Sequence, residues 1–392
     1  MSEVRHNACH AARLWVESLT LSNFRNYRYA SVSVDHRPVV LVGDNGAGKT
    51  NLLEAVSLLA PGQGLRRTAY ADLARVGSSG DWAVAARMHS EGTAVDIGTG
   101  IQTGAASSGR GGRIVRIDGT AQSGSGALAD YVDMVWLTPA SDGLFAGPAS
   151  DRRRFLDRLV LCFDPTYRNR VGNFDRAMRQ RNRLLEEGVR DSARFEGFET
   201  SMAETGTAIA AARAEFVAAM RVEMDERKQR SPDAVFPWAK VELDGALETA
   251  LAERPAIDVE DEYRADLARN RERDRAAGRT LSGPHRSDLA LHHGPKDMPA
   301  KICSTGEQKA LLVSLVLAHA ELSAARRAGV PPILLLDEIA AHLDADRRSA
   351  LYADLLRIGT QSWMTGTDLS AFEALGSEAT FWRVADGVVT EI

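Results

Sequence analysis

The apolar and polar positions of the first 60 residues alternate in the manner of a β–α fold. Leu14–Leu21 and Val32–Val34 have the pattern of strands, and the uninterrupted apolar run Val39–Val42 has that of a buried strand. A glycine-rich loop follows this run. Asn51–Leu59 then shows the apolar spacing of a helix. The chain therefore opens with strands that lead through a loop into a helix.

The next segment, residues 82–137, has the pattern of short strands joined by turns. Strands are predicted at Trp82–Met88, Ala94–Ile97 and Arg113–Ile117. Asp118-Gly119 is a strong turn signal. The stretch Gly98–Gly112 is so rich in Gly, Ser, Ala and Thr that we expect a mobile loop there.

From Asp151 onward the pattern changes to one typical of helices. Arg152–Cys162, Asn173–Glu187 and Ser192–Arg230 have apolar residues at helical spacing, with a break predicted around Asp164-Pro165. No heptad pattern is sustained over several repeats, so we expect no long coiled coil. The sequence predicts an inserted helical block.

The final third returns to alternation of helices and strands. Helices are predicted at Glu307–Ala325 and Arg347–Leu356, and strands at Ile333–Leu336 and Ser362–Thr365. The chain as a whole is therefore expected to be an α/β head interrupted by a helical lobe. The expected domains are an N-terminal part of the head, a helical lobe and a C-terminal part of the head, at 1–145, 146–280 and 281–392.

Composition limits the class of protein. Its 44% hydrophobic and 26% charged residues are ordinary for a globular chain, and 48 Lys and Arg against 53 Asp and Glu leave a formal charge of −5. No apolar run approaches the roughly 20 residues that a membrane span needs, and the first dozen residues lack the apolar region of a secretory signal. Three cysteines without ligand spacing suit a reducing cytoplasm. We expect a cytoplasmic protein with no membrane partner.

A phosphate-binding loop is predicted between the buried strand and the first helix. Eight consecutive residues fit the pattern G-x-x-x-x-G-K-[ST]: Gly43, Asp44, Asn45, Gly46, Ala47, Gly48, Lys49 and Thr50. The glycines let successive backbone N–H groups face one phosphate, and Lys49 reaches the β and γ oxygens. Thr50 offers a hydroxyl to Mg²⁺, while the following helix directs its positive end at the same anion. This motif predicts that ATP and Mg²⁺ bind here.

Two acidic residues, Asp337 and Glu338, follow the apolar strand Ile333–Leu336. At the carboxyl end of a parallel strand beside the phosphate loop, Asp337 can hold the Mg²⁺ shell. Glu338, one residue on, can orient or deprotonate the attacking water. A core strand with a solvated acidic end is the alternative. Together with the phosphate loop, the pair predicts a nucleotide-hydrolysing centre.

The segment Ser304-Thr305-Gly306-Glu307 precedes the predicted helix of the final third. One interpretation is a capping box, with Ser304 as the N-cap and Glu307 as the third helical residue. The other is an anion site, because a hydroxyl, the Gly306 N–H and a helix N-terminus converge there. The two interpretations are compatible.

The order of these motifs resembles that of an ABC-type ATPase head. The phosphate loop, Ser304–Glu307, Asp337-Glu338 and Ala341–Asp344 occur in this order, and Ser304–Glu307 resembles the S-G-G-E signature of SMC-like chromosome proteins. The opening segment Leu19–Tyr27, with the sequence LTLSNFRNY, is similar to the L-x-x-x-N-F-R-N-Y start of the RecF family of DNA gap-repair proteins. Two further segments, 153–157 and 282–289, match that family as well. The resemblance covers residues 14–392.

The resemblance implies an α/β fold: an ABC-type, SMC-like ATPase head with a helical second lobe. It implies two heads that sandwich two ATP molecules, each signature closing on the partner's γ-phosphate. Ser304, Gly306 and Asp344 would then contribute to nucleotide binding, and Arg25 is placed in the same pocket by resemblance alone. It also implies DNA binding, the mediators RecO and RecR as partners in loading RecA on gapped DNA, and support of the SOS response.

Length and departures from the pattern refine this expectation. Lys49 and Ser304 lie 255 residues apart, whereas SMC heads are separated by hundreds of coiled-coil residues. Thr367 stands where transporter heads have a histidine, Thr305 replaces the first glycine of the signature, and Pro139–Leu144 departs from the usual P-E-D-L segment. These departures predict slow ATP hydrolysis, and the resemblance implies that this hydrolysis serves as a DNA-binding switch. An ABC-type motor or transport ATPase is the alternative, and a nucleotide-dependent scaffold without DNA is a third.

Two groups of arginines are candidate DNA contacts. Residues 151–190 hold 11 Arg and 6 Asp and Glu, and Arg176, Arg179 and Arg183 recur at helical spacing. A solvated helix with mixed ion pairs is the alternative for that face. Arg66 and Arg67 follow the phosphate-loop helix, where SMC-like heads have an arginine loop near DNA and nucleotide. Contacts of either kind would be made to phosphates, so DNA binding should depend on salt with little base readout.

Overall fold

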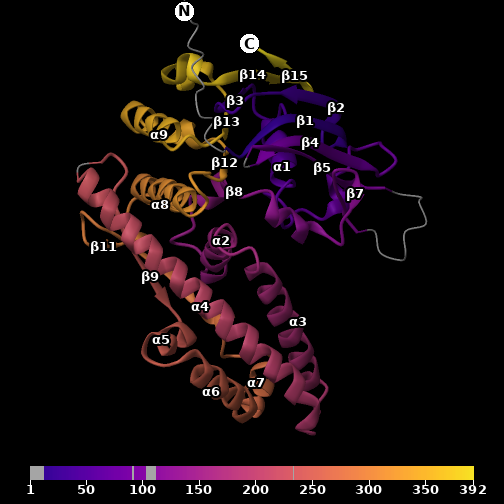
Figure 1. Cartoon of the computed structure of the whole chain (residues 1–392), viewed down its shortest axis with the longest axis vertical. Coiled ribbons are helices and arrows are strands. Elements are labelled where there is room, and N and C mark those ends of the chain that lie inside the picture. The colour runs from indigo at the N-terminus through magenta and orange to yellow at the C-terminus, as the bar shows by residue number, and fades with distance from the viewer. Residues whose placement is uncertain (1–12, 91, 103–111, 233) are drawn as a thin grey trace, which may run out of the picture. The chain divides into compact units, whose positions relative to one another are not determined.

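The computed structural model describes residues 13–90, 92–102, 112–232 and 234–392 (Figure 1). The chain forms two compact units. The first unit comprises Met1–Ser141 and His319–Ile392, and the second unit comprises Asp142–Ala318. These are units of packing, and the division of the chain into domains at 145/146 and 280/281 stays a prediction.

One sheet of the first unit is mostly parallel and carries the phosphate loop. Its strands, in spatial order, are β15 (Val388–Glu391), β14 (Thr380–Ala385), β3 (Val39–Val42), β13 (Ser362–Gly366), β12 (Ile333–Leu336) and β8 (Met134–Leu137). Every residue of β3 and β12 is buried. This explains their uninterrupted apolar runs, because parallel strands are covered on both faces.

The second sheet of the first unit is antiparallel. Its strands, in spatial order, are β2 (Tyr27–Ser33), β1 (Trp15–Phe24), β4 (Trp82–Ser90), β5 (Thr93–Ile101), β6 (Ile114–Ile117) and β7 (Thr120–Ala121). Buried and exposed positions alternate along β4, as expected for a sheet with one face on the core. Helix α1 (Lys49–Ser57) contributes to the same hydrophobic core.

The loop predicted at Gly98–Gly112 is wrong in its first part. Gly98–Ile101 belongs to β5, while residues 103–111 lie outside the described residues. A β-carbon at Gly100 would come within 2.2 Å of the Trp82 carbonyl oxygen. The small residues there therefore permit close approach of two strands rather than chain mobility.

The second unit contains the predicted helical block. Its helices are α2 (Ala149–Leu161), α3 (Tyr167–Glu186), α4 (Ala193–Arg230), α5 (Ala246–Glu253), α6 (Ala256–Arg269) and α7 (Arg271–Ala277). Helices α3 and α4 pack along each other (Figure 1). The sequence pattern did not predict the small sheet of this unit, which comprises β9 (Ala239–Asp244), β10 (Asp288–His293) and β11 (Met298–Pro299).

The remaining helices belong to the final third of the chain. Helix α8 (Thr305–Arg326) begins in the second unit and ends in the first. Helix α9 (Ala345–Ile358) follows β12. Both lie within two residues of the predicted ends. No helix among the described residues is long and apolar enough to cross a membrane.

Candidate nucleotide-binding site

The phosphate loop lies between β3 and α1, as the sequence predicts. Gly46 and Gly48 have φ angles of 84° and 118°, in the region that favours glycine. A β-carbon at Gly48 would lie 2.6 Å from Asn26 Nδ2 and 2.7 Å from the Tyr27 hydroxyl. Asn26 donates to the Ala47 carbonyl (3.1 Å), and Tyr27 donates to the Gly48 carbonyl (3.0 Å). Asn26, in the turn after β1, and Tyr27, at the start of β2, therefore support the backbone of the loop.

Lys49 is the first residue of α1, and its side chain curls back over the loop. Its ammonium group donates to the carbonyls of Gly43 (2.6 Å) and Asp44 (2.9 Å). Burial lowers the pKa of Lys49, and the charges of Glu338 and Asp337 oppose that shift. The Lys49 ammonium group is thus held at the loop by two carbonyl groups, within the electrostatic influence of Asp337 and Glu338.

The structure brings Asp337 against the phosphate-loop helix. Its Oδ1 accepts hydrogen bonds from the hydroxyls of Thr50 (2.9 Å) and Thr365 (2.8 Å). Burial raises the pKa of Asp337, although these two hydroxyls act in the opposite direction. The pairing of β12 with β13 positions Thr365, which the sequence analysis did not single out. The hydroxyl and the carboxylate are hard oxygen donors of the kind that Mg²⁺ accepts.

Glu338 is half-buried and has a left-handed backbone, with φ at 53°. Its N–H donates to the Thr365 hydroxyl at 2.8 Å. Such a conformation is unfavourable for a residue with a β-carbon, so it persists only where surrounding contacts fix it. The acid following Asp337 is therefore held in a particular direction by its neighbours.

A second network surrounds Glu54, whose side chain is only 2% exposed. Arg25 donates to both oxygens of this carboxylate, from Nε at 2.8 Å and from Nη2 at 2.9 Å. Arg66 approaches Glu54 at 3.3 Å and donates to Asn51 Oδ1 at 2.7 Å. Asn51 in turn donates to Asn26 (2.8 Å). Glu54 is not among the site residues predicted from the sequence, although a lone acid in the apolar stretch after the phosphate loop is the signal that could have found it.

These contacts place the two candidate residues Arg25 and Arg66 differently. Arg25 also donates to Thr68 (2.8 Å) and to the Asp72 carbonyl (3.1 Å), so four of its five N–H groups are already directed at protein oxygens. Arg66 has a 41% exposed side chain, and its charge opposes the rise in the pKa of Asp337 that burial causes. Arg67 is exposed, with φ at 56°.

The signature segment lies in the second unit and forms the predicted capping box. The Ser304 N–H and hydroxyl donate to Glu307 Oε2, at 2.8 Å and 2.9 Å, and the Glu307 N–H approaches the Ser304 hydroxyl at 3.4 Å. Lys296 also pairs with Glu307. The Lys296 contact, followed by those of Ser304, lowers the pKa of Glu307 to about 2. The N-cap assignment is confirmed, and the anion-site interpretation stays a prediction.

Asp344 lies in the first unit as the N-cap of α9, where its Oδ1 accepts from the Arg347 N–H at 2.8 Å. It is exposed, as are Ala345 and Asp346, the first two residues of α9. The structure therefore gives Asp344 a local capping role, and its predicted part in nucleotide binding remains a prediction.

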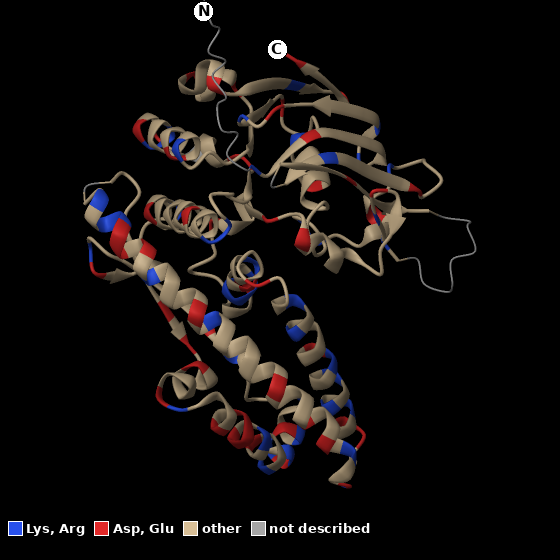
Figure 2. Ribbon diagram, viewed as in Figure 1, with Lys and Arg blue, Asp and Glu red and all other residues tan. Residues whose placement is uncertain are grey.

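The basic face predicted in the helical block lies on α3. Figure 2 shows several Lys and Arg positions, in blue, along α3. Arg176, Arg179 and Arg183 are exposed there, and Arg183 also pairs with Glu187 at 2.9 Å. Arg181, on the same helix, is fully buried and pairs with Glu199 (3.1 Å) and Asp274. Only part of the arginine-rich segment is therefore available to a ligand.

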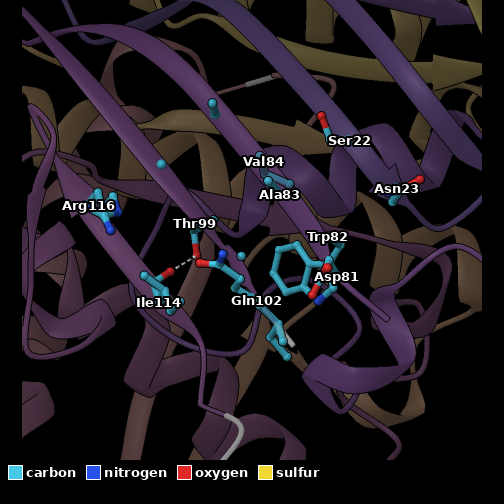
Figure 3. Close-up of a pocket in the computed structure, with 14 residues that line it drawn as sticks. Ser22, Asn23, Asp81, Trp82, Ala83, Val84, Thr99, Gln102, Ile114 and Arg116 are labelled. Atoms are coloured by element: carbon cyan, nitrogen blue, oxygen red, sulfur yellow. Dashed lines mark hydrogen bonds between the residues drawn. The ribbon is translucent and has the colours of Figure 1, made fainter. Parts of the chain in front are cut away.

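A separate hollow of about 420 Å³ lies on the outward face of the antiparallel sheet (Figure 3). Small residues of β4 and β5 form part of its lining, and Ile114 and Arg116 of β6 line another part. None of residues 43–50 lines it. It is a surface feature distinct from the phosphate loop.

Comparisons with known proteins identify the family. The family model described as "RecF/RecN/SMC N terminal domain" matches residues 15–364. A protein of Mesorhizobium japonicum named "DNA replication and repair protein RecF" is 53% identical over 378 residues, which is 96% of this chain and 98% of that protein. One of the same name from Rhizobium johnstonii is 52% identical over 373 residues, which is 95% of this chain and 98% of that protein.

Solved structures confirm the fold. A structure of the recombination mediator protein RecF with ATPrS has a TM-score of 0.82 at 21% identity, covering 98% of this chain and 100% of that one. An Smc head domain from Pyrococcus furiosus has a TM-score of 0.53 at 16% identity, covering 97% and 96%. The predicted α/β, SMC-like ATPase head is therefore confirmed, as is the resemblance drawn from Leu19–Tyr27. The chain belongs to the RecF family of DNA replication and repair proteins.

Proposed function

We propose that this protein is an ATP-gated DNA clamp used in replication-gap repair. The observation that carries the proposal is the contact between Thr50 and Asp337, because it joins the phosphate loop to the acidic pair across 287 residues of sequence. ATP binding would join two heads around DNA, and slow hydrolysis would release them. The solved structures of RecF with ATPrS and with ATP support ATP as the nucleotide.

Different residues of the first unit would bind the phosphates, hold Mg²⁺ and activate the attacking water. Backbone N–H groups of residues 43–50 and the Lys49 ammonium would bind the phosphates. Thr50 and Asp337 would hold Mg²⁺, which neutralises charge on the phosphate oxygens when bound. Glu338 would accept a proton from the attacking water. Arg25 keeps at most one N–H for the nucleotide, so we propose that it acts mainly by bracing α1 through Glu54.

The composite site would be completed by a second copy of the chain. Ser304 and the Gly306 N–H lie at the N-terminus of α8, a 22-residue helix whose positive end favours an anion. Ser304 is exposed, so a second molecule can reach it. We propose that it contacts the γ-phosphate bound by the partner, and that Asp344 lines the same composite site.

Within this scheme Arg66 and Arg67 are the preferred DNA contacts, and the exposed arginines of α3 are the second candidates. The two exposed arginines lie on the loop that follows α1, so nucleotide and DNA would be sensed by adjacent residues. By resemblance to the family, RecO and RecR would be the protein partners. The outcome would be loading of RecA on gapped DNA and support of the SOS response. The protein would act in the cytoplasm. The solved RecF structures are of a recombination mediator in the RecFOR pathway, which supports the choice of partners.

The proposal is tested by DNA binding measured with ATP, with ADP and with a slowly hydrolysed ATP analogue. Tight binding with ATP and the analogue, and weak binding with ADP, is the expected result. Equal affinity in all three conditions would contradict gating by ATP. The alternative, a motor or transport ATPase, is not favoured by the family assignment; it predicts rapid turnover that DNA does not alter.

A further inference from the structure

The carboxyl end of β13 joins the two halves of the nucleotide site. The Gly366 carbonyl accepts from the Gly43 N–H (3.3 Å), where the phosphate loop begins. One residue earlier, the Thr365 hydroxyl donates to Asp337 and accepts from the Glu338 N–H, both at 2.8 Å. Two consecutive residues therefore contact the phosphate loop and the acidic pair.

The register of the parallel sheet explains this placement. Leu336 pairs with Met364 across β12 and β13, and Gly366 pairs with Val42 across β13 and β3. Thr365 therefore lies at the level where β12 ends and the acids begin. Its side chain is fully buried, so its hydroxyl needs protein partners. It has them, with one donated and one accepted hydrogen bond.

We propose that Thr365 is the positioning residue for Glu338 in ATP hydrolysis. Glu338 has a left-handed backbone that is unfavourable for a glutamate, and the Thr365 hydroxyl is the hydrogen-bond acceptor of its N–H. Losing that acceptor leaves the N–H unpaired and lets the backbone relax, which moves the carboxylate away from the attacking water. The inference rests on the proposed hydrolysis of ATP by this site.

The hydroxyl group of Thr365, and not its methyl group, makes both hydrogen bonds to the acidic pair. Valine has nearly the shape of threonine but can neither donate nor accept a hydrogen bond, whereas serine keeps the hydroxyl and loses the methyl group. Thr365→Val and Thr365→Ser are therefore a matched pair in which only the first removes the hydrogen-bond acceptor of the Glu338 N–H. Thr365→Ala also lacks a hydroxyl. If Thr365→Val lowers the unfolding temperature of the protein, the activity of Thr365→Ala is compared with that of Thr365→Ser instead.

The experiment measures ATP turnover of the full-length protein with DNA and saturating Mg²⁺, together with ATP affinity. Thr365→Val should lower kcat by about 10- to 100-fold. A loss of this size is expected when a reacting group is displaced by up to about 1 Å. The KM for ATP should change by less than about threefold, since the phosphate loop is intact. Thr365→Ser should stay within about threefold of the wild type in both quantities.

A double-mutant cycle tests whether Thr365 acts through Glu338. In a Glu338→Gln background, Thr365→Val should cause no further loss of the residual rate. Losses that multiply, a Thr365→Ser protein as slow as Thr365→Val, or a defect that higher Mg²⁺ abolishes would each overturn the inference. A wild-type protein without ATP turnover would instead contradict the proposed function. Full activity of Thr365→Val beside an active wild type would remove only the role given to Thr365.

Discussion

Replacing Arg67 and Arg66 by alanine, singly, separates phosphate contact from structural support. No hydrogen bond or ion pair of the Arg67 side chain is found within the described part of the chain, so Arg67→Ala should change the free energy of unfolding by less than about 0.5 kcal/mol. Arg66 contacts the buried Glu54. Because Arg25 still pairs with both oxygens of that carboxylate, Arg66→Ala leaves no unpaired buried charge, and the penalty of about 3–5 kcal/mol for one is avoided.

The magnitude of the DNA effect follows from counterion release. If each arginine neutralises one phosphate of duplex DNA, each substitution should lower the slope of log affinity against log salt by about 0.9. The ratio of wild-type to variant affinity should then shrink about 3.5-fold between 50 and 200 mM salt. Fluorescence anisotropy with labelled duplex DNA and a slowly hydrolysed ATP analogue measures both quantities.

Arg116→Ala is the matched control for these two variants. Arg116 is an exposed arginine of the same unit, on the outward face of the antiparallel sheet, and it donates to the Gly119 carbonyl at 3.1 Å. The Arg116→Ala substitution removes the same charge and should leave the slope of log affinity against log salt unchanged. If affinity falls for Arg66→Ala and Arg67→Ala while the slope stays at the wild-type value, these residues are not phosphate contacts. The exposed arginines of α3 would then be tested in the same assay.

Two further predictions concern nucleotide binding and acid stability. Lys49→Ala should abolish ATP binding measured by calorimetry, because the cation facing the β and γ oxygens is lost; normal affinity in a folded variant would refute the phosphate-loop assignment. Glu307 has a pKa of about 2, below its ordinary 4.5, so its ionised form stabilises the fold at neutral pH, and this contribution is lost as pH falls from about 4.5 to about 2. Glu307→Gln should therefore lower the unfolding temperature at pH 7 and leave it nearly unchanged at pH 2; an equal loss at both values would refute this.

The sequence was sufficient where a function depends on neighbouring residues. The phosphate loop is eight consecutive residues, and the capping box of Ser304 and Glu307 spans four, so local spacing predicts both. Strand and helix types followed from periodicity, and the buried run at 39–42 matches β3 in both bounds. These features need no knowledge of tertiary contacts.

Contacts between distant segments could not be predicted in the same way. Thr365 acts on Asp337 only because β12 and β13 are adjacent in a given register, and one apolar strand looks much like another. Glu54 is paired with Arg25, 29 residues away. Arg181 is one of the 11 arginines of residues 151–190, yet it lies on the helix face of Phe174, Ala177 and Leu185, all of which are buried. Its spacing of four residues from two of these was the signal of burial.

The central claim, that ATP joins two heads into a clamp, is tested most directly by sedimentation of two variants under saturating ATP. Glu338→Gln keeps the size of the side chain and removes its basic oxygen, so this variant should bind ATP, turn it over only at a small residual rate and accumulate as a dimer on DNA. Ser304→Arg should bind ATP yet remain monomeric, and mixing it with Lys49→Ala should restore at most one of the two composite sites. A Glu338→Gln protein that stays monomeric, or a Ser304→Arg protein that dimerises normally, would contradict the account.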